Sequence, residues 1–133
     1  MRYQNWPERL SEIIERRLQK CFEWGEHDCC LFAADVVAAL TGVDFGAELR
    51  GTYSTALEAA RILKERGGVR GIASAALGAE IPPLMAQRGD IIMYRSANGE
   101  ALGVCVGAQF VAAGTNALLR GGMDEALAAW RVK

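Results

Sequence analysis

The sequence predicts an α+β domain in which N-terminal helices pack on a C-terminal antiparallel sheet. Apolar residues recur at helical spacing through the first two thirds of the chain, whereas short apolar runs separated by glycines begin at Asp90. Helices followed by strands, rather than alternating with them, are typical of this fold class. The 133 residues predict one domain, residues 1–133, which is long enough to bury its own core.

Four helices are expected before the strands. The first covers residues 6–21, where an early proline and an apolar stripe opposite charged residues indicate an amphipathic helix. The second covers residues 29–40 and is apolar nearly all round, so we expect it at the centre of the core. After a loop over residues 43–53, glycines end the helices expected over residues 54–66 and 69–77.

The last third of the chain predicts strands. Residues 90–94 form the first, and Asn98-Gly99 is a strong signal for a hairpin turn. Strands are then expected over residues 101–106 and 109–113, with a final one over residues 128–132. Consecutive short strands joined by tight turns indicate antiparallel pairing.

Composition limits the partners and the compartment. The net charge of −1 leaves no strong field that would attract nucleic acid or a membrane surface, and no apolar stretch reaches the ~20 residues of a membrane span. The first residues lead into a charged segment, so we expect no signal peptide and synthesis in the cytoplasm.

The cysteines predict neither disulfides nor a metal centre. In a reducing compartment the four thiols stay free, and their spacing matches no zinc or iron–sulfur site, so no metal and no cofactor is expected. For Cys21 and Cys105 we expect the role of buried small hydrophobic residues.

The segment over residues 22–30, FEWGEHDCC, combines a turn with the start of the central helix. Asp28 is expected to cap that helix, with a contribution of about 1 kcal/mol. Cys29 then lies at the helix N-terminus, where the helix dipole favours a thiolate, which makes it the candidate nucleophile. Trp24, His27 and Asp28 are the candidates to line a binding groove, although a tryptophan in such a turn often packs against the core.

His27 is the single histidine of the chain and the only side chain that ordinarily titrates near neutral pH. A nucleophilic cysteine needs a base within hydrogen-bonding reach. A base two residues before Cys29 is geometrically awkward, so we favour a histidine on the surface or in a substrate groove. Catalysis by His27 is the alternative.

Four segments in this order resemble the NlpC-type family of bacterial cell-wall cysteine peptidases, which have a papain-like α+β fold. Residues 22–25 resemble the family's Tyr-x-Trp-Gly-Gly, and residues 28–30 resemble its Asp-Cys-Ser-Gly. Residues 88–94 resemble Pro-Gly-Asp and its strand. Asp90 itself is expected to anchor the loop before that strand through backbone hydrogen bonds. Residues 101–107 resemble the strand that carries the catalytic histidine. The resemblance implies a papain-like domain with Cys29 at the nucleophile position.

Two departures from the family bear on activity. Ala101 stands where the family carries its catalytic histidine, and only valine and alanine occur near Ala112, where a third polar residue belongs. Losing the base and its orienter costs a cysteine hydrolase orders of magnitude in rate. We therefore expect a structural or interaction protein rather than an enzyme.

The chain also resembles small tailed-phage and prophage proteins that are related to NlpC-type peptidases. This resemblance implies a virion component made in the bacterial cytoplasm, with other tail-tip, hub or baseplate proteins as partners. The alternative is an active peptidase or amidase on peptidoglycan peptides, with Cys29 as nucleophile and His27 or a residue of a partner chain as base.

Overall fold

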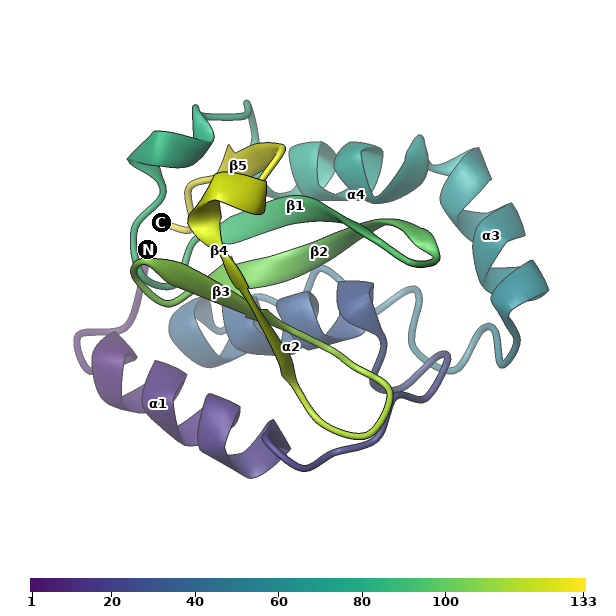
Figure 1. Ribbon diagram of the computed structural model, residues 1–133, viewed down its shortest axis with the longest axis horizontal. Coiled ribbons are helices and arrows are strands. Elements are labelled where there is room, and N and C mark those ends of the chain that lie inside the picture. Colours follow the sequence, from purple (N-terminus) through teal and green to yellow (C-terminus); the bar gives the residue numbers. More distant parts are fainter.

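The computed structural model describes residues 1–133 and contains four helices followed by a five-stranded sheet (Figure 1). The helices are α1 (Trp6–Arg17), α2 (Cys29–Thr41), α3 (Ala56–Glu65) and α4 (Gly68–Leu77). The strands are β1 (Ile91–Ser96), β2 (Gly99–Cys105), β3 (Gln109–Ala112), β4 (Leu119–Gly122) and β5 (Ala128–Trp130). Two short 3₁₀ turns, η1 (Pro83–Met85) and η2 (Met123–Glu125), flank the sheet. The predicted α+β class is confirmed.

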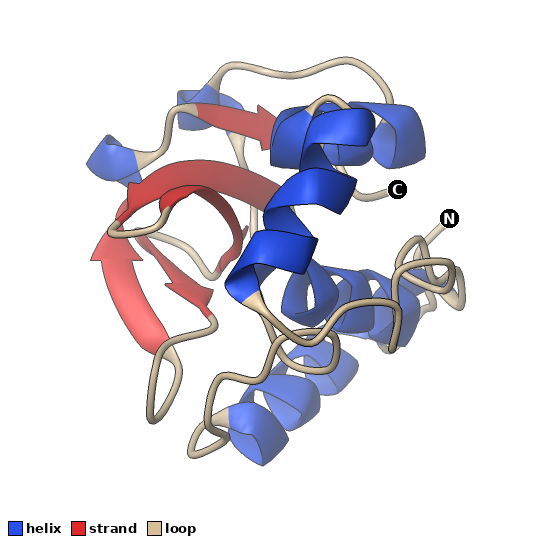
Figure 2. Cartoon of the chain, turned by 90° about the vertical axis from the view of Figure 1, so that its right-hand side faces the viewer, coloured by secondary structure: helices blue, strands red, loops and turns tan.

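The sheet is antiparallel throughout, with the strand order β4-β3-β2-β1-β5. Helix α2 contacts β2 and β3, helix α4 contacts β1, β2 and β5, and α1 packs on α2. Figure 2 shows the helices gathered on one side of the curved sheet. The central position expected for the second helix is confirmed, since eight of its residues are buried.

The core has two parts because alternate residues of each strand face opposite sides of the sheet. The larger part, the inner cluster, joins the sheet to the helices. The smaller part, the outer cluster, lies on the other face and consists of Ile92, Tyr94, Ala101, Cys105, Phe110, Ala112 and Ala129. Segments next to η1 and η2 pack against this second face.

Three details differ from the sequence predictions. Helix α1 ends at Arg17, before the expected residue 21, and the chain then turns toward the loop before α2. Strand β4 is not predicted because its sequence, LRGG, is half glycine, which is depleted in strands. The tight turn is at residues 97–98, with Gly99 at the start of β2 at φ +107°.

Asp90 joins the two ends of the chain to the sheet. Its carboxylate is fully buried and accepts four hydrogen bonds. One oxygen accepts from Arg2 Nη2 at 2.9 Å and from the Val132 N–H at 3.0 Å. The other accepts from Arg131 Nε at 3.0 Å and from the Gln87 N–H at 2.9 Å. Asp90 therefore anchors the loop before β1, as expected, and also fixes both termini, which lie side by side in Figures 1 and 2.

Candidate functional site

The turn before α2 is a small hairpin closed by backbone hydrogen bonds between Glu23 and His27, 2.9 and 2.8 Å long. Gly25 lies at its tip with φ +83°, and a Cβ there would approach the Tyr53 carbonyl oxygen to 2.1 Å. Glycine is therefore required at this position. Trp24 is half-buried, with its ring edge-on to Phe22 at 4.7 Å, and it packs against the inner cluster.

Asp28 begins α2 and holds the hairpin against it. The carboxylate is 1 % exposed. It accepts hydrogen bonds from the Leu31 N–H at 2.9 Å and from the Gly25 N–H at 3.0 Å. The Tyr53 hydroxyl donates a third bond of 2.6 Å. The predicted N-cap is confirmed, and the same carboxylate also joins the hairpin to the loop before α3.

Cys29 is the first residue of α2, but its surroundings oppose a thiolate. The side chain packs against both the inner and the outer cluster. Burial raises the pKa of the Cys29 thiol to about 11; the backbone amide of Leu102 lowers that pKa, and the neighbouring Asp28 raises it further. Desolvation is therefore the largest contribution to the shift, and it opposes the thiolate that the start of a helix favours.

The structure brings Ala101 and Ala112 close to the candidate nucleophile. Both belong to the outer cluster, against which Cys29 packs. Tyr94 is opposite Ala101 in the β1–β2 ladder, and its ring lies 4.7 Å from that of Phe110. Burial raises the pKa of Tyr94 to about 12, and the nearby Cys29 adds to this rise, so the phenol is neutral at pH 7. The outer cluster therefore presents mainly apolar and aromatic side chains to Cys29.

His27 is not on the surface, so this part of the prediction is wrong. The side chain is 0 % exposed, and its ring lies edge-on to Phe32 with centroids 5.6 Å apart. Neither ring nitrogen has a hydrogen-bond partner, so no hydrogen bond joins His27 to Cys29. Burial lowers the pKa of the imidazole, and Arg17 and Lys20 lower it further.

The two outlying cysteines differ in burial. Cys105 is fully buried in the outer cluster, as expected. Cys21 is exposed, so the prediction of a buried role is wrong. The reason is the early end of α1: Cys21 lies in the irregular segment after the helix, with its thiol 3.9 Å from the Asn116 carbonyl oxygen.

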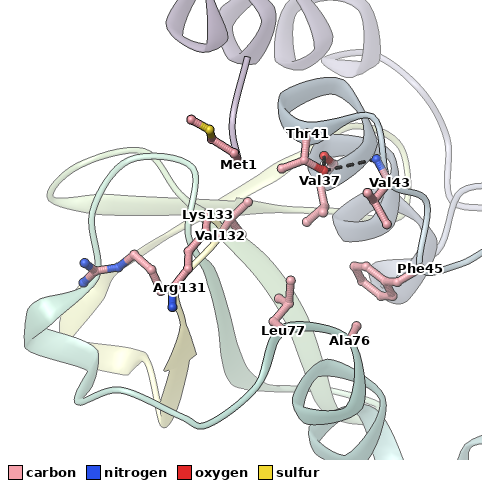
Figure 3. A pocket seen from close by; sticks show the side chains of 10 residues that line it. All are labelled: Met1, Val37, Thr41, Val43, Phe45, Ala76, Leu77, Arg131, Val132 and Lys133. Atoms are coloured by element: carbon pink, nitrogen blue, oxygen red, sulfur yellow. Dashed lines mark hydrogen bonds between the residues drawn. The ribbon is translucent and has the colours of Figure 1, made fainter. Parts of the chain in front are cut away.

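None of the four principal surface pockets is lined by Cys29, His27 or Trp24. Figure 3 shows the most apolar one, between the C-terminal ends of α2 and α4 and the last residues of the chain. Its volume of about 190 Å³ is small beside the ~300–1,000 Å³ of typical ligand pockets. The Thr41 hydroxyl at its wall already donates to the Val37 carbonyl and accepts from the Val43 N–H.

Comparison with known proteins adds a family. A model of the family described as a domain of unknown function, DUF6950, matches residues 1–132. The chain belongs to this family. No curated protein matches the chain. None of the four helices of this DUF6950 domain has the length and the apolar character needed to cross a bilayer.

Tyr53 and Tyr94 are the residues of this region that sequence reasoning missed. Neither lies in a recognisable motif, and each reaches the start of α2 only through the tertiary fold: Tyr53 bonds Asp28, and Tyr94 belongs to the cluster on which Cys29 packs. For Tyr94 the sequence offers one signal: an aromatic residue within the strand expected over residues 90–94 indicates a bulky side chain on that part of the sheet.

The thiol of Cys29 in this DUF6950 domain is expected to alkylate slowly. Since the thiolate reacts and the pKa is about 11, its rate with iodoacetamide at pH 8 should be at least about a hundredfold below that of the exposed Cys21. Tandem mass spectrometry of the labelled protein locates the modified residue. Rapid labelling of Cys29 that saturates below pH 8 would contradict this assignment.

Proposed function

We propose that this DUF6950 domain is a non-catalytic structural or interaction protein with a papain-like, NlpC-type fold, located in the tail tip or baseplate of a phage or prophage. The observation that carries the proposal is the apolar wall at Cys29. By the resemblance, Ala101 stands at the base position, and Ala112 lies in the stretch over residues 110–113 where the orienting residue belongs; both alanines are buried in the outer cluster. Nothing on this wall can accept the thiol proton.

The energetics of the thiol support the absence of catalysis. With a pKa of about 11, roughly one Cys29 in 10⁴ is a thiolate at pH 7. Cysteine hydrolases overcome this with an adjacent base that is itself oriented by a third group. Here the outer-cluster residues next to the thiol are apolar apart from Cys105 and the phenol of Tyr94, which is neutral at that pH. The buried carboxylate of Asp28 already accepts three hydrogen bonds and raises the pKa of the thiol.

The order and placement of the elements support the NlpC-type assignment. A Trp-Gly turn leads into a capped central helix, and the strand after Gly89-Asp90 is followed by the strand that begins at the base position. Helix α2 packs directly on that strand, β2. The backbone amide of Leu102, the neighbour of Ala101 on β2, acts on the Cys29 thiol, which supports a base position beside the start of α2.

The alternative function is an active peptidase or amidase on peptidoglycan peptides. One observation favours it: Cys29 is only half-buried, and backbone amides of Leu102 and Cys30 lower its pKa, as they would in a site that stabilises a thiolate. A partner chain would then have to supply the base. His27, which has no hydrogen bond to the thiol, is poorly placed for that role.

Incubation with purified peptidoglycan fragments separates the two functions. We expect no cleavage by the wild type, alone or together with tail proteins from the same phage or prophage genome, and no difference from the Cys29→Ala variant. We also expect the wild type and Cys29→Ala to co-purify equally with one of those tail proteins when they are co-expressed. Cleavage that disappears in Cys29→Ala would overturn the proposal, as would a wild-type domain that stays monomeric and binds none of them.

A further inference from the structure

The least expected group in the domain is the imidazole of His27. It is completely buried, and both ring nitrogens lack a partner. About nine in ten or more of the buried polar groups in proteins are hydrogen-bonded, because leaving one unpaired is destabilising. A neutral imidazole without partners tolerates this position, but an imidazolium would bury an uncompensated charge.

The charged groups that face the ring come from both neighbouring helices. Arg17 and Lys20 lie at the end of α1 and beyond it, and Asp28 and Asp35 belong to the start and the middle of α2. The two cations repel a proton on His27.

Neither carboxylate near His27 is free to receive an imidazolium. Asp28 already accepts three hydrogen bonds. Asp35 forms ion pairs with both Arg17 and Arg50. Protonation of His27 therefore finds no counter-ion in the closed structure.

Apart from its links to α1, the segment over residues 18–27 is joined to the rest of the domain by four backbone groups. The Gly25 N–H donates to Asp28 at 3.0 Å, and the Gly25 carbonyl accepts from the Gly51 N–H at 3.0 Å. The hairpin over residues 21–27 bonds to the β3–β4 connection through the Phe22 N–H and the Thr115 carbonyl, at 3.0 Å. The segment that follows α1 is held there through the Leu118 N–H and the Leu18 carbonyl, also at 3.0 Å. A region with so few backbone links can open without unfolding the sheet.

We propose that His27 is a pH-sensitive latch: the segment over residues 18–27 stays closed while the imidazole is neutral, and protonation of the imidazole releases that segment. During a transient opening of the segment, a proton from solvent binds a ring nitrogen of His27. The imidazolium is hydrated in the open state and would lose that hydration on closing, so the segment remains open. Opening separates the hairpin from the β3–β4 connection and exposes Trp24 and the start of α2. The latch depends only on burial and charge, so it holds whether or not Cys29 is catalytic.

The sign of the pH dependence follows from linkage. The pKa of His27 is lowered in the closed state, whereas an open, solvated histidine has its ordinary value near 6.5. The open state therefore binds more protons below about pH 6.5, and each further pH unit favours opening by up to a factor of ten. The segment is fully closed above that pH and opens as the pH falls.

Amide hydrogen exchange, read by mass spectrometry at pH 7.5 and 5.0 and corrected for intrinsic rates, tests the latch. In the wild type we expect protection over residues 18–27 to fall about tenfold at pH 5.0, while β1 and β2 keep theirs. In His27→Leu the protection should not change with pH, and His27→Phe provides a second variant in case the first folds poorly. Glu26→Gln, an exposed neighbour in the same hairpin, should behave like the wild type.

Three results would overturn the latch. The first is unchanged protection of residues 18–27 in the wild type at pH 5.0. The second is an equal loss in the folded His27 variants. The third is a loss spread over the whole sheet, which would make His27 a determinant of global stability rather than of local opening.

Discussion

Replacing Asp90 with alanine is expected to lower the free energy of unfolding by about 3–5 kcal/mol, which is typical when one partner of a buried ion pair is removed. Two guanidinium groups, of Arg2 and Arg131, and two backbone N–H groups would lose their shared acceptor. The termini would then detach from the loop before β1. Urea denaturation followed by circular dichroism measures the change.

Two comparisons make the Asp90 result specific. Asp90→Asn keeps one acceptor oxygen and the shape of the side chain, so it should fall between the wild type and the alanine variant. Asp124→Ala removes an exposed carboxylate of the same type and should change stability by less than about 0.5 kcal/mol. A loss below about 1 kcal/mol in Asp90→Ala would mean that the four hydrogen bonds do not hold the termini.

The sequence predicts the role of Asp90 only in part. Its place before a strand indicates a loop anchor, and the local bond to the Gln87 N–H agrees with that. The partners Arg2 and Arg131 are 88 and 41 residues away, and no local pattern distinguishes these arginines from those on the surface. Contacts between residues so far apart in the sequence depend on how the two termini meet, which only the complete fold determines.

The same limit applies to Cys29 and His27. The local sequence correctly places Cys29 at the start of a capped helix, and the helix dipole there favours a thiolate. Its pKa is instead raised by burial, to which the outer cluster contributes from strands more than 60 residues further along the chain. His27 follows Gly25 and Glu26 and resembles a surface position, yet the ring turns inward onto Phe32. Periodicity thus predicts the elements, while burial at their junctions requires the tertiary structure.

Asp28→Ala is expected to lower the free energy of unfolding by at least about 3 kcal/mol. Loss of the N-cap alone costs about 1 kcal/mol. The Gly25 N–H and the Tyr53 hydroxyl would also lose their acceptor inside the protein, and each unpaired buried group costs about 1–3 kcal/mol. Thermal unfolding and urea titration of the purified variant measure the loss.

The matched variants for Asp28 separate structure from chemistry in the turn before α2. Glu26→Ala, in the same hairpin but exposed, should leave stability unchanged, and Cys29→Ala should cost about 1 kcal/mol or less because the thiol is half-buried and makes no strong hydrogen bond. If Asp28→Ala is the only severe change of the three, this motif is maintained by the need to start a buried helix. A stability loss in Cys29→Ala as large as that in Asp28→Ala would contradict this conclusion and give the thiol a structural role that its contacts do not explain.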